Sequence, residues 1–222
     1  MNAGQSPLEW AAREQRKARK GVRRRLTAWM GLNPAARRAD ALAARAAHGA
    51  VGEQWTAALL TGLPGGWRVW HGLRLAGYGN DFDHVLGSPC GSAVVVLDSK
   101  RWHAQRVTHL RGGRVHCGGE DRHGQIEAVA RYAARLHQAL AIPGVTVWPL
   151  LVVHGSRVDN GTPANTGVLA ARAPAWPGPV YVLSPLYLVP TLASAPKVSD
   201  PGRAAVLAAR VDQVLRPYGE GG

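Results

Sequence analysis

The sequence has few cysteines and no long apolar run. Its two cysteines, Cys90 and Cys117, belong to no CxxC pair, so neither a zinc site nor a disulfide framework is expected. We expect free thiols in a reducing cytoplasm. No apolar run approaches the roughly 20 residues that cross a bilayer, and the N-terminus lacks the apolar stretch of a secretory signal. These absences predict a cytoplasmic protein without an integral membrane segment.

Acidic residues are also scarce. The 222 residues include 14 Asp and Glu against 27 Lys and Arg, which gives a net charge of +13. Residues 1–46 alone carry 11 basic and three acidic residues. A basic chain attracts polyanions through counterion release, so nucleic acid is the first partner to consider. A solvated basic face or contact with anionic lipid would suit the same charge, and charge alone does not choose among the three.

Apolar residues make up 46% of the sequence, which is enough to build a packed core. A basic helix is predicted over residues 8–31, because its apolar residues recur at helical spacing. Pro34 ends this pattern, since the residue before a proline is pushed out of helical geometry. Residues 35–47 are rich in Ala and Arg and predict a second helix. We therefore expect residues 1–46 to form a basic helical N-terminal extension.

The remaining segments predict a mixture of strands and helices. In chain order they read as a short helix, several strands, a long helix, two strands and a closing helix, which indicates an α/β fold with a mixed sheet. The predicted helices span residues 51–61, 125–140 and 203–215. The predicted strands span residues 67–75, 83–87, 93–100, 114–117, 146–153, 166–170 and 180–183.

Charged residues stand in or beside two adjacent strands in the stretch GNDFDHVLGSPCGSAVVVLDSKRW, residues 79–102. Because side chains alternate faces with period two, Asp98 and Lys100 share one face, about 7 Å apart. The short SPCG link predicts an antiparallel hairpin. One register sets Asp83 directly opposite Asp98; the other sets Asp81 there, with Asp83 as the diagonal neighbour. Either register brings carboxylates within about 5–8 Å at Cβ.

Such a set of charges is costly unless it has a function. Like charges opposite each other destabilise a sheet, and a divalent cation between them would reverse that cost. Mg²⁺ binds a few carboxylate oxygens and keeps waters and phosphate oxygens as its other ligands. Lys100 could then orient an attacking water, which suits phosphodiester hydrolysis. The alternative is that these residues end their strands and face water, with Asp81 as a turn residue.

Four motifs occur in order: GAVGE at Gly49–Glu53, GNDFDHV at Gly79–Val85, LDSK at Leu97–Lys100, and a helix led by Gln125. This arrangement resembles the NERD (nuclease-related) domain, a family similar to the PD-(D/E)XK nuclease superfamily. The resemblance covers about residues 47–190 and implies a restriction-endonuclease-like core, a central mixed β-sheet flanked by helices. Residues 191–222 are expected to add a C-terminal helix that packs on this domain.

The resemblance also implies roles for individual residues. Asp83 and Asp98 would bind a metal ion, Mg²⁺ or Mn²⁺, and Lys100 would be the catalytic lysine. Glu53 would be an additional acid that reaches the metal from its helix. Periodicity alone leaves the direction of Glu53 open, because it falls beside the apolar stripe of that helix.

His84 and Gln125 would line the same site. From the residues alone, His84 lies on the opposite strand face from Asp83, which favours a structural hydrogen bond, and Gln125 stands near a helix start. Several arginines are expected to contact nucleic-acid phosphates, against the alternative of ordinary surface charge. They are Arg101, Arg106, Arg23, Arg24 and Arg25.

Two functions of different classes follow. The first is a metal-dependent nuclease that hydrolyses phosphodiester bonds, with DNA as the expected substrate. The second is a catalytically inactive nucleic-acid-binding module of the same fold, which would bind through residues 1–46. Attachment to an anionic membrane surface through the same basic helix is a third and weaker alternative.

Overall fold

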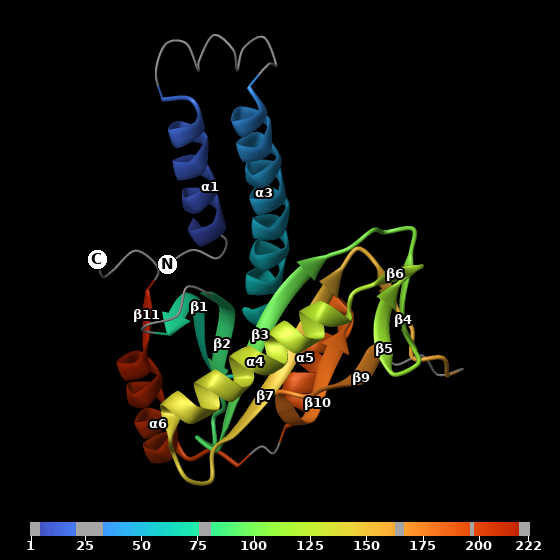
Figure 1. Ribbon diagram of the computed structural model, residues 1–222. Coiled ribbons are helices and arrows are strands. Elements are labelled where there is room, and N and C mark those ends of the chain that lie inside the picture. The colour runs from blue at the N-terminus through green and yellow to red at the C-terminus, as the bar shows by residue number, and fades with distance from the viewer. Residues whose placement is uncertain (1–4, 21–32, 76–80, 163–166, 196–197, 218–222) are drawn as a thin grey trace.

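A computed structural model describes residues 5–20, 33–75, 81–162, 167–195 and 198–217 (Figure 1). In sheet order, its central sheet contains β11 (Leu215–Pro217), β1 (Arg68–Leu75), β2 (Asp81–Gly87), β3 (Ala93–Arg101), β7 (Thr146–His154), β10 (Trp176–Leu183) and β9 (Val168–Ala173). A smaller sheet contains β6 (Glu120–Asp121), β5 (Arg114–Cys117), β4 (Val107–Arg111) and β8 (Arg157–Val158). The helices are α1 (Gln5–Ala18), α3 (Pro34–Leu60), α4 (His123–Leu140), α5 (Pro185–Ala193) and α6 (Pro201–Val214).

Helices cover both faces of the central sheet. The apolar side chains of α4 and α6 pack on one face, where they form a core with Val94 and Val96 of β3. Side chains of α3 and α5 form a second core on the other face, with Val95 and Leu97 of the same strand. Both faces of β3 are therefore buried, as an unbroken apolar run in a central strand predicts. The arrangement confirms the predicted α/β fold with a restriction-endonuclease-like core.

The central sheet is mixed because β3 pairs differently on its two sides. With β2 it forms the predicted antiparallel hairpin, and with β7 it runs parallel from the Ala93–Thr146 pair to the Arg101–His154 pair. A parallel pair needs a long crossover, and α4 lies in that crossover. The carboxyl ends of β3 and β7 consequently lie side by side.

α3 is one continuous helix of 27 residues, whereas the sequence predicted a break between residues 47 and 51. That predicted break is wrong. The helix begins after Asn33, whose Oδ1 accepts hydrogen bonds from the backbone N–H groups of Ala35 and Ala36, both at 3.1 Å. Pro34 occupies the first turn, where its missing N–H costs nothing. α3 therefore carries the chain from residue 34 to the sheet without interruption.

α1 packs along the first half of α3, and the two form a helical arm that projects from the sheet (Figure 1). Asp40 of α3 joins the helices, because it accepts a hydrogen bond from Gln15 at 2.9 Å and pairs with Arg19 at 2.8 Å. The predicted helix over residues 8–31 is confirmed as far as Ala18, and its residues 21–31 lie outside the described residues. The buried residues of this arm are small: Ala11, Ala36 and Ala39.

The chain returns to the central sheet at its end. α6 covers nearly the same residues as the helix predicted over residues 203–215. β11 follows it and pairs antiparallel with β1. Neither β11 nor α5 was predicted. Cys90 and Cys117 are free thiols, as expected. Among the described helices, none is long and apolar enough to cross a membrane.

Candidate functional site

The pairing of β2 with β3 decides between the two predicted registers. His84 pairs with Leu97, and the ladder continues to Gly87 and Val94. The same register, carried one residue beyond His84, sets Asp83 opposite Asp98. Asp81 is the first residue of β2 and stands opposite Arg74 of β1, so the expectation of a turn there is wrong.

Asp83 accepts a hydrogen bond where a backbone carbonyl would normally do so. Its Oδ2 lies 2.7 Å from the backbone nitrogen of Ser99, which donates to it. Desolvation raises the pKa of Asp83 well above its usual value, and the nearby charges of Asp98 and Glu53 raise it further. The Asp83 carboxylate is therefore a group whose negative charge this site disfavours.

Asp98 and Lys100 form an ion pair on the same face of β3, as strand parity predicts. Asp98 is only 8% exposed, and the Lys100 Nζ lies 2.5 Å from its Oδ2. The same Nζ donates to the Ser99 carbonyl at 3.2 Å. Desolvation lowers the pKa of Lys100, but the charges of Asp98 and Asp83 outweigh it, so that pKa lies above its ordinary value. Lys100 is accordingly a fixed cation.

Glu53 approaches this group from α3 and is 7% exposed. Its charge raises the pKa of both Asp83 and Lys100, so it acts on the same site. A pocket of about 540 Å³ opens beside these residues, and Glu53 is the acid in its wall. The pocket is otherwise lined by His48, Gly49, Ser99, Lys100, Arg101, Trp102, His103, Arg122 and Gln125.

A chain of hydrogen bonds fixes α3 against the end of β3. The Ser99 hydroxyl donates to Thr56 Oγ1 at 2.8 Å, and the same Thr56 oxygen lies 2.8 Å from Nε2 of His154. All three side chains are buried. Thr56 stands three residues after Glu53, so this contact holds the turn of α3 that carries the acid. The sequence did not lead us to Thr56 or His154. The available signal was that each is a polar residue beside a buried apolar segment.

Gln125 is part of the wall of the pocket. Its Oε1 accepts a hydrogen bond from the Trp102 indole at 3.1 Å, so its amide N–H₂ group is directed away from that indole. The Arg122 guanidinium lies 6.0 Å from the Trp102 ring centroid. Trp102 thus orients two groups of the pocket wall, a role that the sequence did not reveal.

His84 lies behind the site, on the opposite face from Asp83, and is not among the residues that line the pocket. It is fully buried, and its Nδ1 is 2.7 Å from Nδ1 of His71. Burial, followed by the charge of His71, lowers the pKa of His84 to about 3, although the Glu53 backbone partly opposes this. His84 is therefore neutral at physiological pH and serves as a hydrogen-bonding core residue.

The arginines expected to contact nucleic acid occupy different settings. Arg101 ends β3 and lines the pocket. Arg106 forms an ion pair with Glu120 on the exposed surface of the small sheet. The other three lie outside the described residues: Arg23, Arg24 and Arg25.

The acids of the site offer oxygen donors only, which are the ligands that Mg²⁺ and Mn²⁺ prefer. The raised pKa of Asp83 also fits a position that a cation would stabilise. Over the described ranges, no three Asp, Glu, His or Cys side chains already surround one point as metal ligands do. Asp98 instead faces Lys100, and Asp83 faces the Ser99 N–H. The donor chemistry fits a divalent ion, and side-chain rotation would have to complete its coordination.

Comparison with protein families agrees with this geometry. Residues 48–154 match the model of the family described as NERD, nuclease-related domain. The matched segment begins in α3 before Glu53 and ends at His154, so it contains the acids, the lysine and the pocket. No curated protein and no solved structure matches the chain. Residues 48–154 are therefore a nuclease-related (NERD) domain of the PD-(D/E)XK-like nuclease group.

Proposed function

We propose that this protein is a metal-dependent nuclease that hydrolyses phosphodiester bonds in DNA. The observation that carries the proposal is the meeting of Asp83 and Asp98 across β2 and β3, with Lys100 and Glu53 beside them. Three acids around one lysine leave an excess of negative charge in a partly desolvated site. The wall of the adjoining pocket carries three cations, Lys100, Arg101 and Arg122, against the one acid Glu53, which suits the phosphates of a nucleic acid.

In this proposal Asp83, Asp98 and Glu53 hold Mg²⁺ or Mn²⁺. The ion, when bound, supplies an acidified water and neutralises charge on the phosphate. Because the pKa of Lys100 is raised, its ammonium group donates hydrogen bonds and does not act as a base. Lys100 then orients the attacking water or stabilises a phosphate oxygen.

The other wall residues bind and orient the substrate. Gln125 directs its amide N–H₂ group away from Trp102, where it can donate to a phosphate oxygen. Arg101 adds a cation at the end of β3, next to Lys100. The chain of Ser99, Thr56 and His154 keeps α3 at a fixed distance, so that Glu53 stays beside the pocket.

The proposal is tested by incubating the protein with supercoiled DNA, linear duplex, single-stranded DNA and RNA. Each substrate is tested with Mg²⁺, with Mn²⁺ and with chelator. Metal-dependent cleavage that is lost in both Asp98→Ala and Lys100→Ala supports the proposal. Asp159→Asn is the control, because Asp159 pairs with Arg157 outside the pocket and its loss should leave cleavage intact. Normal cleavage by either site variant contradicts the proposed mechanism.

A second candidate is a nucleic-acid-binding module without catalysis. The observation that favours it is the helical arm, whose cations exceed its acids, together with the direct ion pair between Asp98 and Lys100. This candidate predicts salt-sensitive DNA binding that needs no metal and survives Asp98→Ala. Neutralising Arg37 and Arg38 on the exposed surface of α3 should then weaken binding more than any change in the pocket.

A further inference from the structure

Arg101 is held against α3 by a recess on that helix. His48, Gly52 and Trp55 share one helical face, at spacings of four and three residues. A Cβ placed on Gly52 would lie 3.8 Å from the Cβ of Arg101, which is already van der Waals contact. A side chain that extends beyond Cβ at position 52 would press on the space between Arg101 and His154. The glycine therefore leaves room for the Arg101 stem to cross α3 between its two larger neighbours.

Those neighbours hold the guanidinium group. The Arg101 Cζ lies 5.0 Å from the centroid of the Trp55 ring, within the range of a cation–π contact. Its Nη1 lies 3.4 Å from Nδ1 of His48. Trp55 remains 46% exposed, which is unusual for so large an apolar side chain and is explained if the ring serves to position the arginine.

Arg101 differs from the other arginines near the pocket. Arg106 and Arg122 both pair with Glu120, and Arg114 pairs with Asp121. No ion pair involves Arg101 among the residues that the structure describes. Aromatic and imidazole groups fix its direction without cancelling its charge. An ordered cation of this kind has already lost the side-chain freedom that binding would otherwise cost.

The position of Arg101 on β3 indicates what it binds. Lys100 and Arg101 are consecutive, so they leave the strand on opposite faces, and both line the pocket. Lys100 is engaged with Asp98, whereas Arg101 is exposed and has no carboxylate partner among the described residues. Resting on the nuclease proposed above, we infer that Arg101 is a preset clamp for the phosphate next to the scissile one. Trp55 and His48 are its positioning residues.

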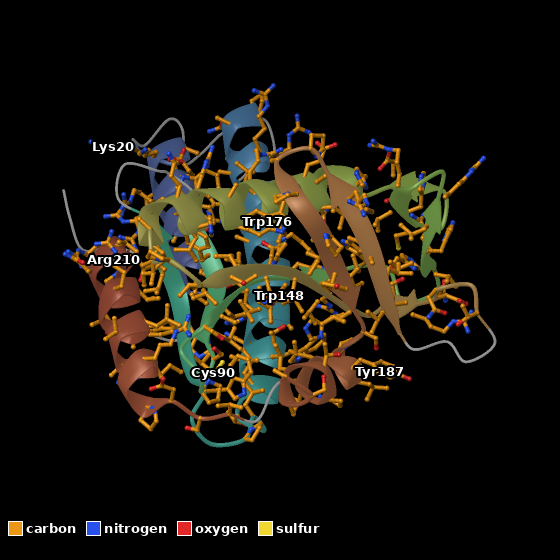
Figure 2. All side chains as sticks on the ribbon, turned by 90° about the horizontal axis from the view of Figure 1, so that it is seen from below. Lys20, Cys90, Trp148, Trp176, Tyr187 and Arg210 are labelled. Carbon is orange, nitrogen blue, oxygen red and sulfur yellow. The ribbon has the colours of Figure 1, made fainter. Side chains whose placement is uncertain are left out.

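The test compares Arg101→Gln, Trp55→Leu and the double variant with two controls. Arg111→Gln removes an exposed arginine from the end of β4. Trp148→Leu removes another half-exposed tryptophan, 42% exposed, on β7 (Figure 2). Binding of a fluorescent duplex is measured by anisotropy in chelator over a salt series. Cleavage is measured separately with Mg²⁺, and melting temperatures identify variants that are misfolded.

Arg101→Gln should weaken binding about tenfold, as expected for losing one charge-assisted contact. It should also reduce the slope of log K against log salt by about 0.9. Trp55→Leu should weaken binding less and should add nothing in the Arg101→Gln background, because its other ring contact is with the buried His154, inside the protein. Trp148→Leu combined with Arg101→Gln should show simply additive effects.

The outcomes separate this inference from the proposed nuclease. If the protein binds DNA through Arg101 but never cleaves it, the nuclease proposal fails and the phosphate clamp stands. If the protein cleaves DNA and Arg101→Gln changes neither binding nor KM, the clamp is wrong and the nuclease stands. Additive effects of Trp55→Leu and Arg101→Gln would overturn the positioning role of Trp55. Absence of both DNA binding and DNA cleavage would overturn both proposals.

Discussion

The charged residues at the end of β3 and those of the small sheet differ in burial and in how they are paired. On the small sheet, exposed arginines pair with Glu120 and Asp121. At the end of β3, three acids share one lysine, and two of those acids, Glu53 and Asp98, are almost fully buried. Exposed pairs of the first kind contribute little to stability. An excess of buried charge of the second kind is costly to stability, and a bound cation, as proposed above, would offset that cost.

The largest expected effect comes from removing the charges of Asp98 and Lys100 near the end of β3. Lys100→Ala and Asp98→Asn should each lower the rate of metal-dependent DNA cleavage by about a thousandfold, the loss typical of removing one electrostatic catalytic group. Single-turnover kinetics measure this rate. Comparable rates in the variants and the wild type would show that these two charges do not act in catalysis.

A second effect concerns the pH dependence of folding. The pKa of His84 is lowered to about 3 in the fold, against 6.5 in the unfolded chain. The unfolded chain therefore binds the proton more readily, and stability present above pH 6.5 should be lost as the pH falls toward 3. One such proton contributes at most about 1.4 kcal/mol per pH unit.

Urea unfolding of the wild type and of His84→Asn over this pH range measures the contribution. His103→Asn is the matched control, because His103 is exposed. Parallel stability curves for wild type and His84→Asn would show that the buried imidazole does not carry the effect.

A third effect is a gain in stability. Asp83→Asn keeps an oxygen for the Ser99 N–H and removes the disfavoured charge. In metal-free buffer we expect a gain of about 1–2 kcal/mol in the free energy of unfolding at neutral pH, the range of typical stabilising substitutions.

The sign follows from the raised pKa of Asp83. Its stabilising contribution is present below the unfolded pKa of 3.8 and is lost as the pH rises through the higher folded value. The difference between the variant and the wild type should therefore shrink toward pH 3 and grow toward neutral pH. An Asp83→Asn protein that is less stable at neutral pH would reverse this interpretation.

The smallest effect is expected on the small sheet. Asp121→Asn loses the charge that faces Arg114 and keeps an oxygen for the backbone N–H of His123. Because both partners are exposed, the unfolding midpoint should stay within the spread of replicate measurements, and DNA cleavage should be unchanged. A clear loss of stability or of DNA cleavage would mean that the charges of the small sheet matter as the charges at the end of β3 do.

Much of the site could be predicted from the sequence because its information is local. Strand parity placed Asp98 and Lys100 on one face, and the short link between β2 and β3 left only two registers that bring acids together. The structure selects the register that pairs Asp83 with Asp98. The family resemblance, rather than periodicity, supplied Glu53.

The remaining features depend on contacts between distant segments. Thr56 and His154 are 98 residues apart, so no local pattern joins them. The continuous α3 was missed because its interior glycines are poor helix formers, and tertiary packing overrides that preference. β11 has only three residues, and its partner β1 lies far away in the chain. Such pairings become visible only when the sheet is assembled.

We propose that Asp83, Asp98 and Glu53, the acids beside Lys100, together hold a divalent cation. The most direct test is the melting temperature of the wild type, Asp83→Asn and Asp121→Asn, each with Mg²⁺ and with chelator. Mg²⁺ should raise the melting temperature of the wild type and of Asp121→Asn, and it should have little effect on Asp83→Asn. Equal responses of all three proteins, or no response of the wild type, would contradict the claim.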